Sequence, residues 1–231
     1  NITASHLFDP FTPGVLSLFA ILYLLAPLWV RIARNSVAFG TTLALIGIIN
    51  SVLSPGDASL SWDDRIGTSG IDQILSHMLV TGTYPLFPWI FFSILGAGIN
   101  IHTPSIRRLG LASTLGILLC TMFLYESVQT GIPFAQPRGE ALLTFFPANT
   151  PFLIGACTGV LIIWLLLENR QPFRGLHHLG QLSLTLYLVH FIPIYMGSNL
   201  VLTWSLAVPV VIVFTIVWWP LSVFWRTRFP T

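Results

Sequence analysis

The sequence contains no lysine, and only 8% of its 231 residues are charged, whereas 54% are hydrophobic. A soluble domain normally carries about 25% charged residues, so this chain has too few to cover a surface that faces water. The mean hydropathy of +0.81 agrees with that conclusion. The composition therefore excludes a soluble globular protein and predicts an integral membrane protein.

Several functional signatures are also missing. The chain has no basic run longer than Arg107-Arg108, so nothing supports nucleic-acid binding. Its two cysteines, Cys120 and Cys157, both lie in apolar runs, and we expect neither a disulfide nor a metal site. There is no Gly-x-Ser-x-Gly, P-loop, His-Glu-x-x-His or Cys-x-x-Cys motif. The common soluble hydrolase, nucleotide-binding and zinc-site patterns are thus excluded.

Long apolar runs take up most of the chain. A helix needs about 20 apolar residues to cross the hydrocarbon core of a bilayer. By this measure we predict an all-α polytopic bundle, with residues 1–231 forming a single transmembrane domain. The seven predicted spans are residues 13–31, 37–54, 84–101, 109–125, 151–167, 180–198 and 201–225.

Prolines interrupt four of the spans, and a shorter helix precedes one of them. Kinks are expected at Pro27, Pro88, Pro193 and Pro209, because proline removes a helical hydrogen bond. Residues 70–80 are too few to cross the membrane. They predict an amphipathic helix at the membrane surface that leads into the third span.

The charged residues alternate between successive loops. Eight of the ten arginines fall on one side of the predicted spans: Arg31, Arg34, Arg107, Arg108, Arg170, Arg174, Arg226 and Arg228. Seven of the eight acids fall on the other: Asp9, Asp57, Asp63, Asp64, Asp72, Glu126 and Glu140. Because positively charged short loops stay cytoplasmic, the pattern places the N-terminus outside and the C-terminus in the cytoplasm.

The first residue is Asn1 rather than methionine, shortly before a span whose start is predicted to face the exterior. One interpretation is a mature chain from which a signal peptide has been removed. We favour another, in which an odd number of upstream spans is missing from this chain.

Three segments together resemble the transmembrane acyltransferases related to heparan-α-glucosaminide N-acetyltransferase. They are PGVLSLFAILYLL at 13–25, YPLFPWIFFSILGAG at 84–98 and GQLSLTLYLVHF at 180–191. Their order and spacing resemble the later spans of that family. The resemblance implies transfer of an acyl group, often acetyl from acetyl-CoA entering on the cytoplasmic side, to an exterior sugar. The family's catalytic histidine lies in an early exterior loop upstream of these segments, so no residue here takes that role by motif.

The predicted exterior loops carry the candidate catalytic and acceptor-binding residues. As a general base we consider His77, Asp63 and Asp64, because a base must deprotonate the acceptor. Contacts with the acceptor are predicted for Trp62, Arg65, Arg138 and Glu140. Other interpretations stay open: Arg65 pairs with a neighbouring aspartate, Arg138 pairs with Glu140, and His77 contacts lipid headgroups.

Two further groups of residues point to substrate binding. His190, and with it Tyr187, lies inside the sixth predicted span and is predicted to line a polar cavity. On the cytoplasmic side, arginines suited to binding the phosphates of coenzyme A are Arg31, Arg34, Arg107, Arg108 and Arg174. The alternative is that His190 bonds to another helix and that the arginines only set the topology.

Three functions therefore compete. The first is a membrane acyltransferase, or the later part of one, in a bacterial inner membrane or an equivalent membrane. The second is a non-catalytic accessory subunit that binds other membrane subunits or an upstream fragment of the same gene. The third is a transporter or flippase, compatible with proline-broken spans and an intramembrane histidine. In every case membrane lipids are partners and nucleic acid is not.

Overall fold

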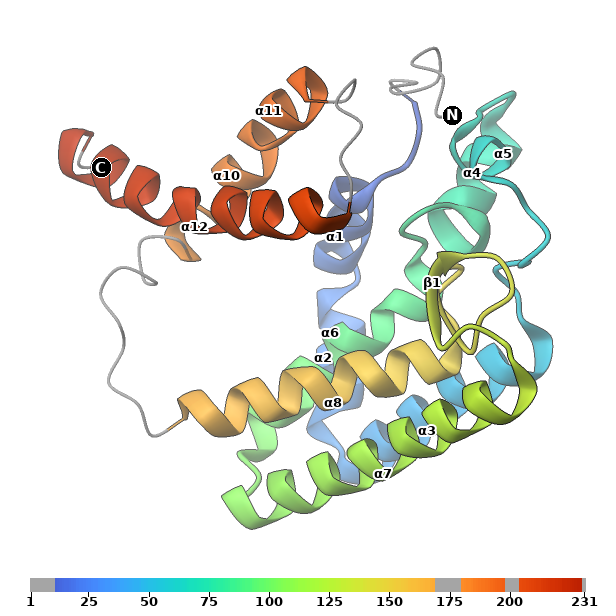
Figure 1. Ribbon diagram of the computed structural model, residues 1–231. Coiled ribbons are helices and arrows are strands. Elements are labelled where there is room, and N and C mark those ends of the chain that lie inside the picture. Colours follow the sequence, from blue (N-terminus) through green and yellow to red (C-terminus); the bar gives the residue numbers. More distant parts are fainter. Residues whose placement is uncertain (1–10, 169–179, 198–203, 230–231) are drawn as a thin grey trace. The chain divides into compact units, whose positions relative to one another are not determined.

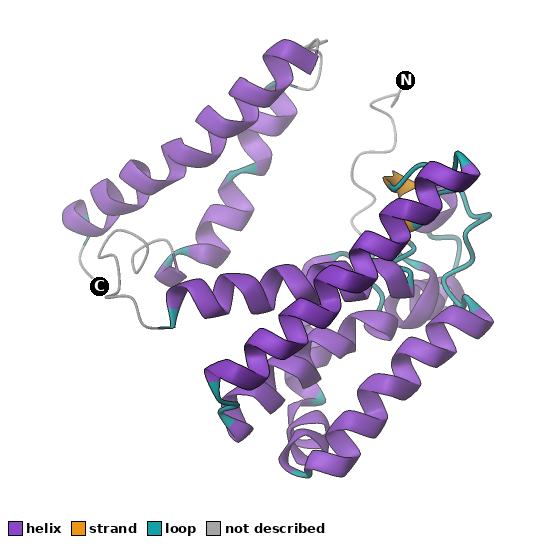
Figure 2. Ribbon diagram, turned by 60° about the horizontal axis from the view of Figure 1, so that its bottom comes forward, coloured by secondary structure: helices purple, strands orange, loops and turns teal. Residues whose placement is uncertain are grey.

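The computed structural model describes residues 11–168, 180–197 and 204–229, most of them in helices (Figure 2). The chain divides into two compact units, Asn1–Glu168 and Asn169–Thr231, and each is treated by itself below. The predicted all-α polytopic membrane fold is confirmed. Within the described residues, four helices are long and apolar enough to cross a membrane, or up to six if each bent pair counts as one span.

The first unit contains the elements from α1 to α8 (Figure 1). In chain order they are α1 (Val15–Leu24), α2 (Ala26–Arg34), α3 (Ser36–Leu53), α4 (Trp62–Ile66), α5 (Ile71–Ser76), the π-helix η2 (His77–Thr81), α6 (Leu86–His102), α7 (Ile106–Thr130), β1 (Ala135–Arg138), β2 (Leu143–Phe146) and α8 (Thr150–Leu167). Of these, α3, α7 and α8 are each long enough to cross the membrane alone.

Two predicted spans are bent. Helices α1 and α2 meet at 66°, and Pro27 occupies the first turn of α2, where its missing N–H is tolerated. The predicted surface helix at 70–80 is present as α5 and η2, and it meets α6 at 44°. Phe87, just before Pro88, has non-helical backbone angles, as expected for a residue preceding proline.

The spanning helices of the first unit pack closely at two glycines, each of which lies against a side chain of the neighbouring helix. Helix α7 lies beside α8, and α6 packs against both α2 and α3 (Figure 1). A Cβ atom built on Gly116 of α7 would lie 2.0 Å from Oγ1 of Thr158 in α8, and one built on Gly98 of α6 would lie 2.2 Å from the ring of Phe39. Glycine at these two positions allows the helix backbones to approach.

We expect Gly116→Ala to destabilise the protein by about 1–3 kcal/mol, because the added methyl group overpacks the contact between α7 and α8. Gly110→Ala in the same helix is the matched control, since nothing lies within 4 Å of a Cβ at that position. Thermal unfolding in mild detergent measures both variants. Equal melting temperatures for the two variants would contradict the close contact at Gly116.

The segment before α8 contains a small departure from the all-helical prediction. Strands β1 and β2 pair in parallel, with Ala135 opposite Leu143 and Arg138 opposite Phe146. Asn149 fixes the strand end to the helix that follows. Its side chain accepts from the N–H groups of Phe152, at 2.9 Å, and Thr144, at 3.2 Å, and it donates to the carbonyl of Leu142 at 2.8 Å.

The second unit contains α10 (Ser183–Val189), α11 (Phe191–Met196) and α12 (Trp204–Arg228). The predicted span 180–198 therefore appears as two short helices that meet at His190. Helices α11 and α12 continue past Pro193 and Pro209, respectively. Nη2 of Arg226 donates to Oε1 of Gln181 at 2.9 Å and so ties the end of α12 to the start of this unit.

Candidate functional site

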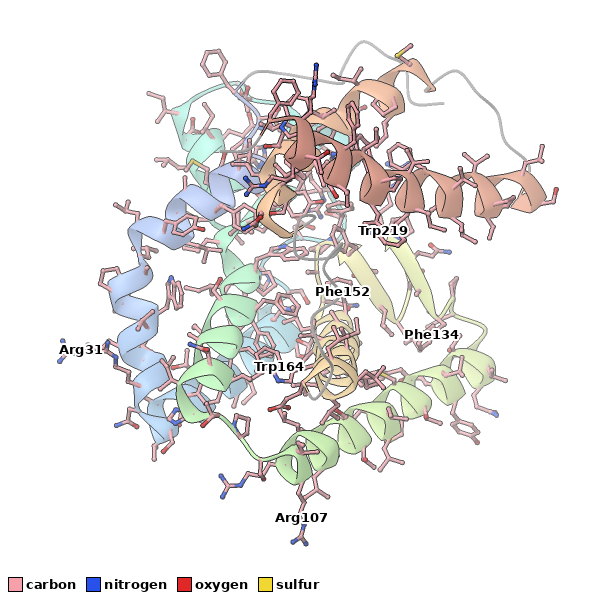
Figure 3. The ribbon with its side chains drawn as sticks, turned by 90° about the vertical axis from the view of Figure 1, so that its left-hand side faces the viewer. Arg31, Arg107, Phe134, Phe152, Trp164 and Trp219 are labelled. Atoms are coloured by element: carbon pink, nitrogen blue, oxygen red, sulfur yellow. The ribbon has the colours of Figure 1, made fainter. Side chains whose placement is uncertain are left out.

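One end of the first unit carries exposed arginines, and we call it the arginine end. Arg31 and Arg34 lie in the last turn of α2, and Arg107 and Arg108 begin α7. Figure 3 shows Arg31 and Arg107 pointing away from the helices. Cations in the last turn of α2 also interact favourably with the helix dipole. The remaining arginine predicted to bind coenzyme A, Arg174, lies outside the described residues.

A histidine that sequence reasoning passed over fixes the arginine end. Nε2 of His102, the last residue of α6, donates to the carbonyl of Ala33 in α2 at 2.8 Å. The ring of Phe39 in α3 lies 5.8 Å from the His102 ring. The ends of α2, α3 and α6 are therefore joined beside Arg34. These contacts hold the helix end that carries Arg31 and Arg34 in place.

The opposite end of the first unit, which we call the loop end, is formed by residues 54–85 and 131–149. The two loops meet through aromatic rings: Trp62 packs edge-on against Phe146 at 5.2 Å, and Tyr84 contacts the same ring at 6.0 Å. Such pairs add about 0.5–1.5 kcal/mol each beyond their buried area. Arg138 and Glu140 are exposed, and the described residues show no ion pair between them.

Arg65 is buried at the loop end, with 1% of its surface exposed. Its Nη1 donates to the carbonyl of Thr81 at 2.9 Å, and its Nη2 donates to the carbonyl of Asp57. Burial lowers the pKa of the Arg65 guanidinium, and the nearby carboxylates of Asp57 and Asp64 oppose that shift. Arg65 is therefore a buried side chain that joins the 54–61 loop to η2, close to the carboxylates of Asp57 and Asp64.

The two aspartates beside Arg65 are held differently. Asp64 forms a capping box with Ser61, whose hydroxyl and N–H lower the pKa of the Asp64 carboxyl. That carboxylate therefore favours the folded state above its ordinary pKa, and the contribution is lost as the pH falls through the lowered value. A lowered pKa makes Asp64 a weaker base. Asp63 is exposed on the same short helix.

His77 is the buried polar centre of the loop end, with 3% of its surface exposed. Nε2 lies 3.0 Å from the carbonyl oxygen of Gly67, and Nδ1 lies 2.8 Å from Oγ1 of Thr81. A carbonyl oxygen only accepts, so Nε2 must carry the proton. In the neutral ring Nδ1 then has a lone pair that accepts from the Thr81 hydroxyl. This burial excludes the interpretation of His77 as a lipid-headgroup contact.

His190 and Tyr187 lie in the second unit, where their rings form a cluster with the ring of Phe191. The His190 ring lies 5.3 Å from that of Tyr187 and 4.3 Å from that of Phe191. Nδ1 of His190 bonds to the backbone carbonyl of Tyr187, within its own turn of helix. Lining of a cavity by these two residues stays a prediction.

Residues that sequence reasoning missed complete the surroundings of His77. Thr81 lies four residues after His77, the spacing at which helical side chains meet, and this spacing was the available signal. Gly67 carried no such signal, because it contributes only its carbonyl. No group of three histidine, cysteine or acidic side chains suited to a metal ion occurs in the described part of the chain.

An apolar groove of about 440 Å³ lies in the first unit between α3 and α8, with Phe91 of α6 beside it. Its lining includes Gly47, Val52, Thr150 and Leu153. The Thr150 hydroxyl donates to the carbonyl of Gly47 at 2.9 Å, so this groove presents almost no free polar group.

A protein-family model, described as an acyltransferase domain, matches residues 15–225 and so covers nearly the whole chain. Neither curated proteins nor solved structures give a match.

Proposed function

Since the chain belongs to the acyltransferase domain family, we propose that it moves an acetyl group from acetyl-CoA to a hydroxyl or amine of an exterior carbohydrate. The relation to heparan-α-glucosaminide N-acetyltransferase and a place in a bacterial inner membrane, or an equivalent one, belong to the same proposal. The observation that carries it is buried His77, whose Nδ1 lone pair faces a hydroxyl group within a family match of 15–225.

In this proposal the arginine end faces the cytoplasm and binds the donor. Coenzyme A is polyanionic, and the planar guanidinium group of arginine binds phosphate through two parallel hydrogen bonds. The described residues present four exposed arginines there, at the end of α2 and the start of α7. The adjoining helix ends are joined by the bond from His102 to Ala33, so the phosphates would meet a fixed surface.

The loop end faces the exterior and holds the base. During transfer, the acceptor oxygen or nitrogen forms a bond to the acetyl carbonyl carbon, and the bond from that carbon to sulfur breaks. The acceptor loses one proton, and the coenzyme A thiolate gains one. His77 is placed to carry that proton, because its ring is held between Gly67 and Thr81 with Nδ1 as the acceptor.

We expect Arg107→Gln combined with Arg108→Gln to raise KM for acetyl-CoA about tenfold or more with little change in kcat. Each charge-assisted hydrogen bond contributes about 1.5–3 kcal/mol. The matched control is Arg138→Gln, an exposed arginine at the loop end. Initial rates at varied acetyl-CoA test this, and equal KM values for the double variant and the control would contradict donor binding at the arginine end.

The proposed function is tested directly with the full chain in lipid nanodiscs. The protein is mixed with acetyl-CoA carrying a radiolabelled acetyl group and with glucosamine, which offers both an amine and hydroxyls. Acetylated glucosamine that forms in proportion to the amount of protein supports the proposal. If label stays on coenzyme A at every donor concentration, the assignment of an acetyltransferase fails.

A further inference from the structure

Three side chains at the loop end form a continuous line of hydrogen bonds. Nδ1 of His77 lies 2.8 Å from Oγ1 of Thr81, and that oxygen lies 3.0 Å from Oγ of Ser76. Because Nε2 donates to Gly67, Nδ1 of the neutral ring accepts, and Thr81 must donate its hydroxyl proton to it. Thr81 then accepts from Ser76. The line has one direction, along which a proton moves from Ser76 through Thr81 to His77.

The π-helix creates this line. In an α-helix, side chains four residues apart meet, whereas side chains five residues apart do not. His77 and Thr81 are four apart, but Ser76 and Thr81 are five apart, and the wider turn of η2 brings them together. The bond from the N–H of Gly82 to the carbonyl of His77, at 3.2 Å, is the five-residue bond typical of such a turn. Single π-turns of this kind are frequent at functional sites.

Residues outside η2 also hold this line of hydrogen bonds in place. Nη1 of Arg65 donates to the carbonyl of Thr81 at 2.9 Å, and the Gly67 carbonyl accepts from His77 at 3.0 Å. Arg65 and Gly67 belong to the segment around α4. Thr81 and His77 are therefore fixed by a different part of the chain, which leaves Ser76 as the member with freedom to react.

Exposure increases from one end of the line to the other. His77 is buried, Thr81 is half-buried and Ser76 is exposed. A substrate therefore meets the Ser76 hydroxyl first, and the base lies behind it. An activated nucleophile is a hydroxyl hydrogen-bonded to a base that a third group orients. Here the Thr81 hydroxyl lies between the Ser76 hydroxyl and His77, and the carbonyl of Gly67 orients the histidine ring.

We propose that Ser76 is the nucleophile that receives the acyl group before the acceptor does, an inference that rests on the proposed function. Oγ of Ser76 attacks the thioester carbonyl carbon, the bond to sulfur breaks, and an ester to Ser76 forms. The Ser76 proton passes through the Thr81 hydroxyl to His77, and His77 then returns it through Thr81 to the coenzyme A thiolate as the thiolate leaves. The acceptor hydroxyl or amine then attacks the ester carbonyl carbon, and the bond from that carbon to Oγ of Ser76 breaks. The acceptor's proton is taken up by His77 through Thr81 and returned to Oγ, which restores the Ser76 hydroxyl.

The experiment traps the ester on the full chain. Protein in nanodiscs is mixed with acetyl-CoA in the absence of glucosamine, quenched in acid within seconds, digested and analysed by mass spectrometry. An acetyl group on Ser76 that disappears when glucosamine is added before the quench is the expected result. Ser69→Ala is the matched control, because Ser69 is an exposed serine of the same loop whose hydroxyl donates instead to Gln73, at 2.7 Å.

Substitutions at Thr81 and Ser76 distinguish a role of the hydrogen-bonded line in catalysis from a role in folding. Thr81→Val keeps the shape and removes the hydroxyl, so we expect Ser76 acetylation to slow about 10²-fold or more, and Thr81→Ser to restore most of it. Ser76→Ala is expected to abolish the trapped ester and to lower glucosamine acetylation by a similar factor. All three variants alter side chains that are not fully buried, and melting temperatures equal to that of the wild type are the control that they fold.

Each outcome decides the question. If the wild-type protein acetylates glucosamine, no ester forms on Ser76 and Ser76→Ala keeps the full rate, the nucleophile is excluded and the proposed function stands. An ester on another residue, His77 included, also overturns the role of Ser76. If neither an ester nor acetylated glucosamine forms, the proposed function fails together with this inference.

Discussion

His77→Gln is expected to lower the rate of acetyl transfer to glucosamine by about 10²–10⁴-fold, the usual contribution of a general base. Glutamine is chosen because its amide donates to the Gly67 carbonyl and its oxygen accepts from the Thr81 hydroxyl. The variant therefore keeps both hydrogen bonds of His77 and loses only the ability to take up a proton. The measurement is kcat at saturating acetyl-CoA, with KM for acetyl-CoA expected to stay unchanged.

The control for this variant is its stability. His77 is buried, so a replacement without hydrogen-bonding groups would leave Gly67 and Thr81 unpaired at a cost of about 1–3 kcal/mol for each group. With glutamine we expect a melting temperature close to that of the wild type. If His77→Gln folds normally and keeps the wild-type rate, His77 is a structural residue and the base lies elsewhere.

Arg65→Met is expected to give the largest loss of stability at the loop end, about 3 kcal/mol or more. Methionine fills part of the same space but donates nothing, so the charge-assisted bonds to the carbonyls of Thr81 and Asp57 are lost, at about 1.5–3 kcal/mol each. Because Arg65 holds Thr81 in place, we also expect the rate of acetyl transfer to fall at temperatures where the Arg65→Met protein is still folded.

Arg138→Met at the exposed end of β1 serves as the comparison, and exposed substitutions of this kind usually change stability by less than about 0.5 kcal/mol. Unfolding in mixed detergent micelles measures both variants. Equal losses for Arg65→Met and Arg138→Met would show that the guanidinium of Arg65 does not stabilise the loop end. Arg65→Lys keeps the charge but not the two-point geometry, so an intermediate loss is expected.

The membrane spans were predictable because they depend on local composition. Helices α3, α7 and α8 match three predicted spans within a few residues, and the bend beside Pro27 follows from the chemistry of proline. The predicted span 180–198 is less regular, because its described residues form two short helices around His190. The glycines that allow close packing were only partly predictable, since Gly116 meets Thr158 through the packing of α7 against α8, which no local pattern encodes.

Only some residues of the candidate site were predictable from the sequence, and their arrangement was not. His77 and Arg65 stand out in the sequence as ionisable groups in predicted exterior loops. Their burial could not be predicted from the sequence. Both side chains are satisfied by backbone carbonyl groups, those of Gly67, Asp57 and Thr81, and every residue has such a group, so no sequence pattern marks the partners. The expected role of Asp64 as a base overlooked a nearer partner: Ser61, three residues before it, forms a capping box with its carboxylate.

The orientation of the two ends in the membrane stays a prediction from charge, and the proposed function depends on it. If the arginine end binds acetyl-CoA and the loop end binds the acceptor, the acyl group crosses the membrane during transfer. Purified full-length protein is reconstituted into sealed liposomes that contain glucosamine, and radiolabelled acetyl-CoA is supplied only outside. Molecules whose arginine end faces outward then have each substrate on its proper side.

We predict that acetylated glucosamine accumulates inside these liposomes, in proportion to the fraction of protein molecules with that orientation. Liposomes with His77→Gln protein are expected to show little product. Acetylation that occurs only when acetyl-CoA and glucosamine share one compartment would contradict transfer between the arginine end and the loop end.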